Sequence, residues 1–199
     1  MLQLAVFTFI PFVVYLVVRR RVRGFGEWIG LTRAPGRVLL AAAVIAVLFA
    51  LAIVPLTRSY LEQRGTVTGG LLMHLNEFGW SPWLAGTILV TAWIKTGLSE
   101  EILFRGFIGK RLIAWLGFAW GNAIQAAIFG ALHLLLVFAV PVEQRTAGLG
   151  AVMLLGPGAA GWLNGYLNHR WGKGSILPGW VMHGLGNTVA YTLPLFILE

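Results

Sequence analysis

The heptapeptide SEEILFR, residues 99–105, places two adjacent carboxylates and an arginine inside an apolar run. The run covers about residues 84–109, and it contains glycine but no proline, with good helix formers around the charges. A transmembrane helix needs about 20 mostly apolar residues, so the run predicts one membrane-spanning helix. Ionisable side chains at membrane depth are costly, and they indicate a functional site.

The composition of the whole chain is that of a membrane protein. Of the 199 residues, 58% are hydrophobic and 11% are charged, whereas a soluble domain is about 45–50% apolar and about 25% charged. Further apolar stretches cover about residues 2–18, 38–56, 121–141, 147–167 and 178–198. We therefore predict an all-α fold, a polytopic membrane helix bundle with about six transmembrane helices, in which residues 1–199 form a single integral membrane domain.

The basic residues predict how the bundle is oriented. If the chain crosses six times, eleven of the fifteen Lys and Arg lie on one side, in or beside segments 19–37, 110–120 and 168–177. Three lie on the other side, and Lys95 lies within a span. The positive-inside rule places the first side in the cytoplasm and both termini outside it. Because the cations lie in short segments between apolar runs, the net charge of +8 does not indicate nucleic-acid binding.

Two further features exclude whole classes of protein. The chain has no cysteine, which excludes disulfides, thiolate metal sites and a cysteine nucleophile. The first apolar run precedes the basic cluster at residues 19–23, whereas in a signal peptide the positive charge comes first. We therefore expect a retained helix. All acidic residues are glutamate, glycine is frequent, and the net charge is positive. This composition favours a protein of a bacterial plasma membrane.

Helix geometry separates the two glutamates of SEEILFR. Glu101 and Arg105 are four residues apart, so they share a helix face and can form an ion pair. Glu100 points about 100° away, on the face of Thr96 and Phe104. One carboxylate therefore has a partner on its own helix, and the other is available for proton chemistry.

Two later spans carry polar residues at the same four-residue spacing. FGALH, residues 129–133, puts Phe129 and His133 on one face of the fourth span. HGLGN, residues 183–187, puts His183 and Asn187 on one face of the sixth. Counted from the cytoplasmic ends of their helices, these groups and Glu100 lie at similar depth. Three helices can therefore present Glu, His and His/Asn to one volume.

These three elements, in this order, resemble the CPBP or Abi family of intramembrane proteases. The family includes CAAX prenyl endopeptidases and proteins linked to bacteriocin processing and self-immunity. Its pattern is EExxxR, FxxxH, and HxxxN or HxxxD on separate helices. The matching residues are Glu100, Glu101, Arg105, Phe129, His133, His183 and Asn187. The resemblance covers about residues 84–198, the expected protease-like core.

The resemblance implies an intramembrane endopeptidase that hydrolyses a peptide bond of a membrane-associated peptide or protein without a cofactor. Glu100 would be the general base for a water that His133 helps to bind. His183 and Asn187 would stabilise the oxyanion, while Glu101, Arg105 and Phe129 would support the site. A base within reach of water and donors preorganised toward the developing charge suit this reaction. The bacterial character favours a substrate without a prenyl group.

Two alternatives stay open at this point. Glu100, His133 and His183 could hold Zn, with water in the fourth position, although the chain has no HExxH motif. The bundle could also be a membrane immunity or transport protein without catalysis. Outside the motifs, we expect His74 to be a solvated loop residue and Asn164 to serve helix packing. Gly161 and Gly165, four residues apart in the fifth span, predict close helix contact.

Overall fold

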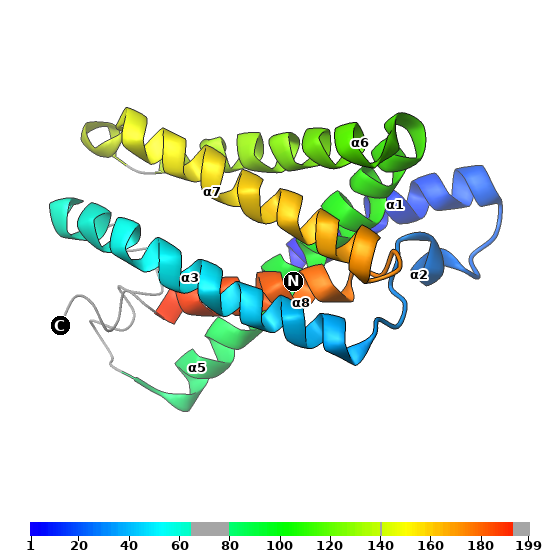
Figure 1. Ribbon diagram of the computed structural model, residues 1–199, viewed down its shortest axis with the longest axis horizontal. Coiled ribbons are helices and arrows are strands. Elements are labelled where there is room, and N and C mark those ends of the chain that lie inside the picture. The colour runs from blue at the N-terminus through cyan, green and yellow to red at the C-terminus, as the bar shows by residue number, and fades with distance from the viewer. Residues whose placement is uncertain (65–79, 140, 193–199) are drawn as a thin grey trace.

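The computed structural model of the chain describes residues 1–64, 80–139 and 141–192. These residues form helices joined by short segments, without a strand among them, which confirms the all-α prediction. Most helices follow the long axis of one bundle, as Figure 1 shows. Within the described ranges, each of the six predicted apolar stretches corresponds to helical structure.

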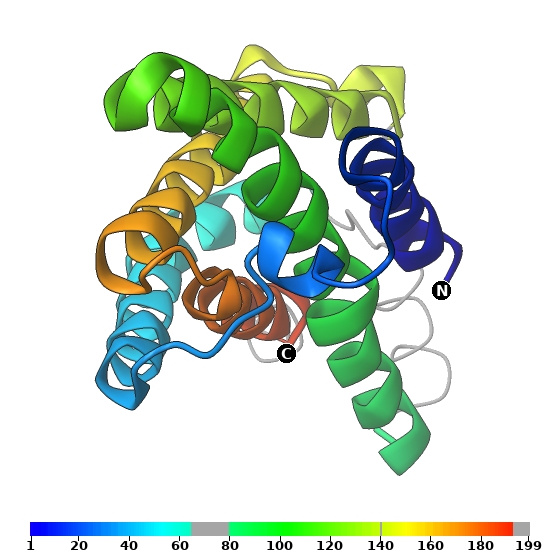
Figure 2. The ribbon, with the colours of Figure 1, turned by 90° about the vertical axis from the view of Figure 1, so that its right-hand side faces the viewer.

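Four of the predicted spans correspond to single α-helices. They are α1 (Leu2–Arg19), α3 (Gly36–Arg64), α7 (Ala147–Tyr166) and α8 (Leu177–Thr192). α6 and α7 pack against each other more extensively than any other pair of helices in the described part of the chain, and α3 packs along α8. Figure 2 shows α1 at the edge of the bundle, where it contacts the segment that carries the glutamates.

The third and fourth spans form one long, interrupted helical segment. It begins as α5 (Pro82–Leu89), where the Ser81 hydroxyl accepts a hydrogen bond from the Leu84 amide at 3.1 Å and Pro82 occupies the first turn. It continues as the π-helices η1 (Val90–Leu98) and η2 (Glu101–Gly109), then as α6 (Lys110–His133) and the short η3 (Leu134–Ala139). π-helical turns are rare and occur frequently at functional sites. SEEILFR lies where η1 meets η2.

Segment 110–120, which we placed on the cytoplasmic side, is mostly helical. α6 starts at Lys110, and the helix is interrupted only at Gly117, whose φ of 77° and ψ of 169° are not helical. A positive φ costs glycine little, so one residue is sufficient for the break. The neighbouring Leu, Ile, Ala and Trp side chains are compatible with helix on both sides.

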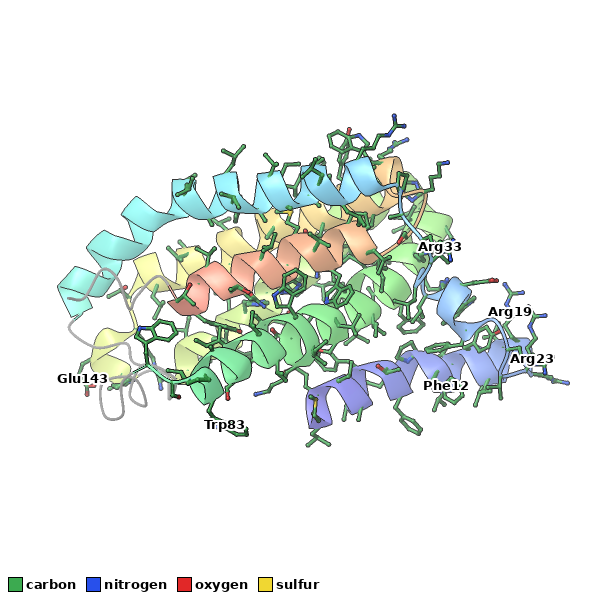
Figure 3. The ribbon with its side chains drawn as sticks, turned by 90° about the horizontal axis from the view of Figure 1, so that it is seen from below. Phe12, Arg19, Arg23, Arg33, Trp83 and Glu143 are labelled. Carbon is green, nitrogen blue, oxygen red and sulfur yellow. The ribbon has the colours of Figure 1, made fainter. Side chains whose placement is uncertain are left out.

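The three segments that we predicted to share the cytoplasmic side meet at one end of the bundle. Arg111 donates to the Trp28 carbonyl at 3.1 Å, and the Ser175 hydroxyl donates to the Thr32 carbonyl at 2.6 Å. The short α2 (Phe25–Trp28) folds over this end, and the side chain of the next residue, Ile29, is buried. Figure 3 shows Arg19, Arg23 and Arg33 at this end and Trp83 and Glu143 at the opposite end.

The predicted close contact along α7 is confirmed. A Cβ atom on Gly161 would lie 3.0 Å from an Arg105 guanidinium nitrogen, and one on Gly165 would collide with the Asn122 side chain. Because both positions lack a side chain, α7 lies directly against the buried polar groups of η2 and α6.

Two described segments are long and apolar enough to cross a membrane by length and composition, Leu2–Arg19 and Pro82–Phe138. The second contains both the third and the fourth predicted span. Within the described ranges, α7 and α8 do not meet the same criterion. The described part of α8 has 16 residues, which is too short for the criterion, and polar side chains such as Asn164 lower the hydropathy of α7.

Candidate active site

Glu101 is the centre of a buried polar cluster. Its side chain is 0% exposed, and its Oε1 lies 3.2 Å from Arg105 Nη1, which confirms the predicted ion pair. Asn164 Nδ2 donates to Oε1 at 3.0 Å, and Asn168 Nδ2 donates to Oε2 at 3.1 Å. Both carboxylate oxygens therefore have partners, as a buried charge requires.

His183 lies between the two carboxylates. Its Nδ1 is 3.3 Å from Glu101 Oε1, and its Nε2 is 3.5 Å from Glu100 Oε2. Each ring nitrogen faces an acidic oxygen, so in either neutral tautomer the one N–H of the ring is directed at a carboxylate. A residue of the sixth span, His183, therefore links the buried Glu101 to Glu100.

Glu100 has partners that the sequence did not indicate. Its side chain is 15% exposed, its Oε2 faces His183, and its Oε1 accepts a hydrogen bond from Gln3 Nε2 at 3.1 Å. We expected no partner from its own helix, and both contacts come from other helices. Figure 3 shows α1, the source of Gln3, alongside the helix of the glutamates.

His133 joins the cluster through Phe129. Its Nδ1 lies 2.8 Å from the Phe129 carbonyl, one turn earlier on the same helix. A carbonyl oxygen can only accept, so a neutral His133 that bonds to it carries its hydrogen on Nδ1, and Nε2 is then the acceptor. The Phe129 ring is buried, with its centroid 4.5 Å from that of His133 and 5.9 Å from that of His183. The Arg105 guanidinium lies 4.0 Å from the same centroid.

Asn187 is held by the long helix. Its Nδ2 donates to Thr96 Oγ1 at 2.8 Å, and Thr96 Oγ1 lies 2.8 Å from the Thr91 carbonyl. An amide NH₂ has two hydrogens, so Asn187 can make this contact and donate to a second acceptor.

A cavity of about 340 Å³ lies between α3, α6, α7 and α8. His133, His183, Asn187 and Asn164 contribute its polar groups, and the rest of the lining is mostly apolar. In the described part of the chain neither glutamate lines this cavity, and His183 connects them to it. A mostly apolar cavity with a few polar groups is typical of a binding site.

Sequence reasoning missed three residues that lie around the Glu101 carboxylate. Asn164, which we assigned to helix packing, and Asn168 both donate to the carboxylate. A Cβ atom on Gly179 would collide with Glu101 Oε2, and the Gly179 amide donates to Asn168 Oδ1 at 2.7 Å. The four-residue spacing of Asn164 and Asn168 was a signal that could have indicated a shared face.

Ser99 and His169 are not part of the polar cluster and make ordinary packing contacts. Ser99 is buried, and its hydroxyl donates to the Lys95 carbonyl at 2.5 Å, so it has an ordinary helix contact. His169 stacks on Phe118 at the basic end, with ring centroids 5.1 Å apart. Burial and the neighbouring charges of Arg170 and Lys110 lower the pKa of His169. His74 lies outside the described residues.

The zinc alternative needs three ligands around one point. Among the described residues, no three His or Glu side chains come close enough together to hold a metal ion. Glu100 and His183 are neighbours, but His133 Nδ1 is directed to its own helix carbonyl. This arrangement of the described residues does not fit a metal site.

A family model described as type II CAAX prenyl endopeptidase Rce1-like matches residues 80–189, which is more than half of the chain. The chain belongs to this family. As a member of the Rce1-like family, it is a membrane-embedded protease, a hydrolase that acts on a membrane-associated peptide. The match includes all seven motif residues, and α1 and α3 lie outside it. No curated protein and no solved structure matches the chain.

Proposed function

We propose that this Rce1-like protein is an intramembrane endopeptidase in which Glu100 activates the attacking water. The observation that carries the proposal is the position of His183 between Glu100 and the anchored Glu101. Glu100 Oε2 and His183 Nε2 are 3.5 Å apart, so one water can lie within hydrogen-bonding distance of both. A base within reach of water is the first requirement for hydrolysis.

The remaining groups then have distinct tasks. Glu100 takes a proton from the water, and the hydroxide oxygen bonds to the carbonyl carbon of the substrate. His183 and Asn187 donate hydrogen bonds to the oxyanion. When the C–N bond breaks, Glu100 returns the proton to the leaving nitrogen. His133, through Nε2, helps to hold the water, and Glu101 with Arg105 fixes the orientation of His183.

The cavity supports a membrane-associated substrate whose apolar part enters between α3 and α7. Its lining includes Phe49, Val152 and Met153 around the polar end formed by the histidines. The composition of the chain favours a bacterial peptide or membrane protein without a prenyl group. Cleavage of a library of apolar peptides by the purified protein in detergent tests this function and supplies a substrate for the variants below.

An Asn187→Ala variant should lose activity in kcat rather than in KM. An oxyanion donor acts mainly as charge develops, and losing one typically costs about 10²–10³ in kcat. Steady-state kinetics on the best library peptide measures both constants. Thr87→Ala, at an exposed position of α5 away from the site, is the control. This control should retain most of its activity.

The zinc alternative predicts different behaviour. In that case the purified, active protein would contain one zinc per chain, a chelator would remove zinc and activity together, and added zinc would restore both. Elemental analysis before and after chelation measures the metal content. This result would overturn the glutamate and water mechanism. An immunity or transport role is the better reading if no library peptide is cleaved by protein that is folded and lipid-embedded.

We also propose a multi-pass bacterial plasma membrane protein with both termini outside the cytoplasm. The meeting of the three basic segments at one end of the bundle and the positive-inside rule support this orientation. Single cysteines at Leu31 and Trp171, both exposed at the basic end, should react only with membrane-permeant reagents in intact cells. A cysteine at the exposed Trp83 is the control and should react with impermeant reagents. The reverse labelling pattern would invert the topology.

A further inference from the structure

Gln3 contacts the proposed general base from outside the matched family region. Its Nε2 donates to Glu100 Oε1 at 3.1 Å, although the two residues are 97 positions apart. The family match begins at residue 80, so α1 adds a polar group that the family motifs do not contain. The proposed mechanism gives this residue no task.

Packing sets the register in which Gln3 meets Glu100. Four residues after Gln3, the Phe7 ring packs edge-on against the Phe104 ring, with centroids 6.2 Å apart. Phe104 likewise follows Glu100 by four residues. Two contacts therefore join α1 to the long helical segment that carries the glutamates, at the same four-residue spacing on both sides. Leu4 adds to this alignment by packing against the buried cluster of Ile29, Ile102 and Ile176.

The basic end of α1 is anchored separately. The Tyr15 hydroxyl donates to the Arg23 carbonyl, and the Tyr15 ring lies 5.2 Å from the Trp28 ring by centroids. Most of the other α1 side chains are exposed or half-buried. Aromatic packing therefore fixes the position of α1. At the end of α1 away from the basic cluster, the Gln3 amide makes a polar contact with Glu100.

The orientation of the Glu100 carboxylate depends on contacts from other helices. The last torsion of a glutamate side chain is broad and roughly two-fold, so the helix alone does not decide which oxygen faces His183. The donor from Gln3 occupies Oε1 and leaves Oε2 toward His183 Nε2. Hydrogen bonds to a charged acceptor are also stronger than those between neutral groups.

We propose that Gln3 is a positioning residue that orients the Glu100 carboxylate for water activation. This inference rests on the proposed function, because it gives Gln3 a role only if Glu100 is the base. Gln3 acts through Glu100 and does not itself touch the substrate.

The test is a Gln3→Met variant, which keeps the length of the side chain and removes the donor. On the best library peptide, kcat should fall roughly tenfold, while KM changes less than about twofold and the melting temperature stays within a few degrees. Gln3→Arg, which retains N–H donors of sufficient reach, should recover most of kcat. Phe9→Met, at an exposed position of α1, is the matched control and should behave as wild type.

Each outcome separates this inference from the mechanism on which it rests. Wild-type kcat in Gln3→Met, together with an inactive Glu100→Gln, overturns the role of Gln3 and leaves the glutamate mechanism standing. An active Glu100→Gln overturns both. If Gln3→Met is unstable, the comparison with Gln3→Arg decides, because equal losses of kcat in the two variants assign Gln3 to packing alone.

Discussion

Glu100→Gln is expected to abolish peptide cleavage while the protein remains folded. General acid–base catalysis typically contributes about 10²–10⁴-fold to the rate, and an amide of the same size cannot accept the proton from water. The Gln3 and His183 contacts of Glu100 involve a side chain that is 15% exposed, and a glutamine can accept the same hydrogen bond from Gln3. The measurements are kcat on the best library peptide and the melting temperature in detergent.

The matched control for this variant is Glu27→Gln. Glu27 is an exposed residue of α2 and is not part of the site, so the same loss of one charge should leave kcat unchanged. Retention of cleavage by Glu100→Gln with loss in Glu101→Gln would reverse the roles that we assign to the two glutamates.

Glu101→Gln is expected to lower stability strongly. The charge of Arg105, whose side chain is 2% exposed, would lose its counter-ion, and breaking a buried pair by removing one partner typically costs about 3–5 kcal/mol. The new amide also places an NH₂ group among donors, because Asn164 and Asn168 both donate to the carboxylate. The free energy of unfolding in detergent measures the effect.

A second substitution distinguishes loss of the pair from general disruption. The double variant Glu101→Gln, Arg105→Gln removes both charges, so its loss of stability should be clearly smaller than the sum of the two single losses. Glu100→Gln serves as the neighbouring control, since it leaves the Glu101–Arg105 pair intact. Strictly additive losses, or a Glu101→Gln variant as stable as wild type, would contradict a role for Glu101 as the buried anchor.

The sequence alone determined which helices form and which residues carry chemistry. Apolar runs of about 20 residues predict spanning helices because lipid leaves no other partner for the backbone. The pair Glu101–Arg105 follows from helix geometry, since residues four apart share a face whatever the rest of the protein does. The motif residues were recognisable because polar groups in apolar runs are rare, and their spacing also carried the family resemblance.

Only the tertiary structure decided how these helices meet. The Gln3–Glu100 contact, the place of His183 between the two glutamates, and the donors Asn164 and Asn168 on Glu101 all join different helices. The periodicity within one helix specifies a face but not the neighbour of that face. That neighbour depends on packing, here on the edge-on contact of Phe7 with Phe104 and the close approach of Gly161 and Gly179 to the buried polar groups. Such contacts form between residues tens of positions apart, so no local pattern in the sequence encodes them.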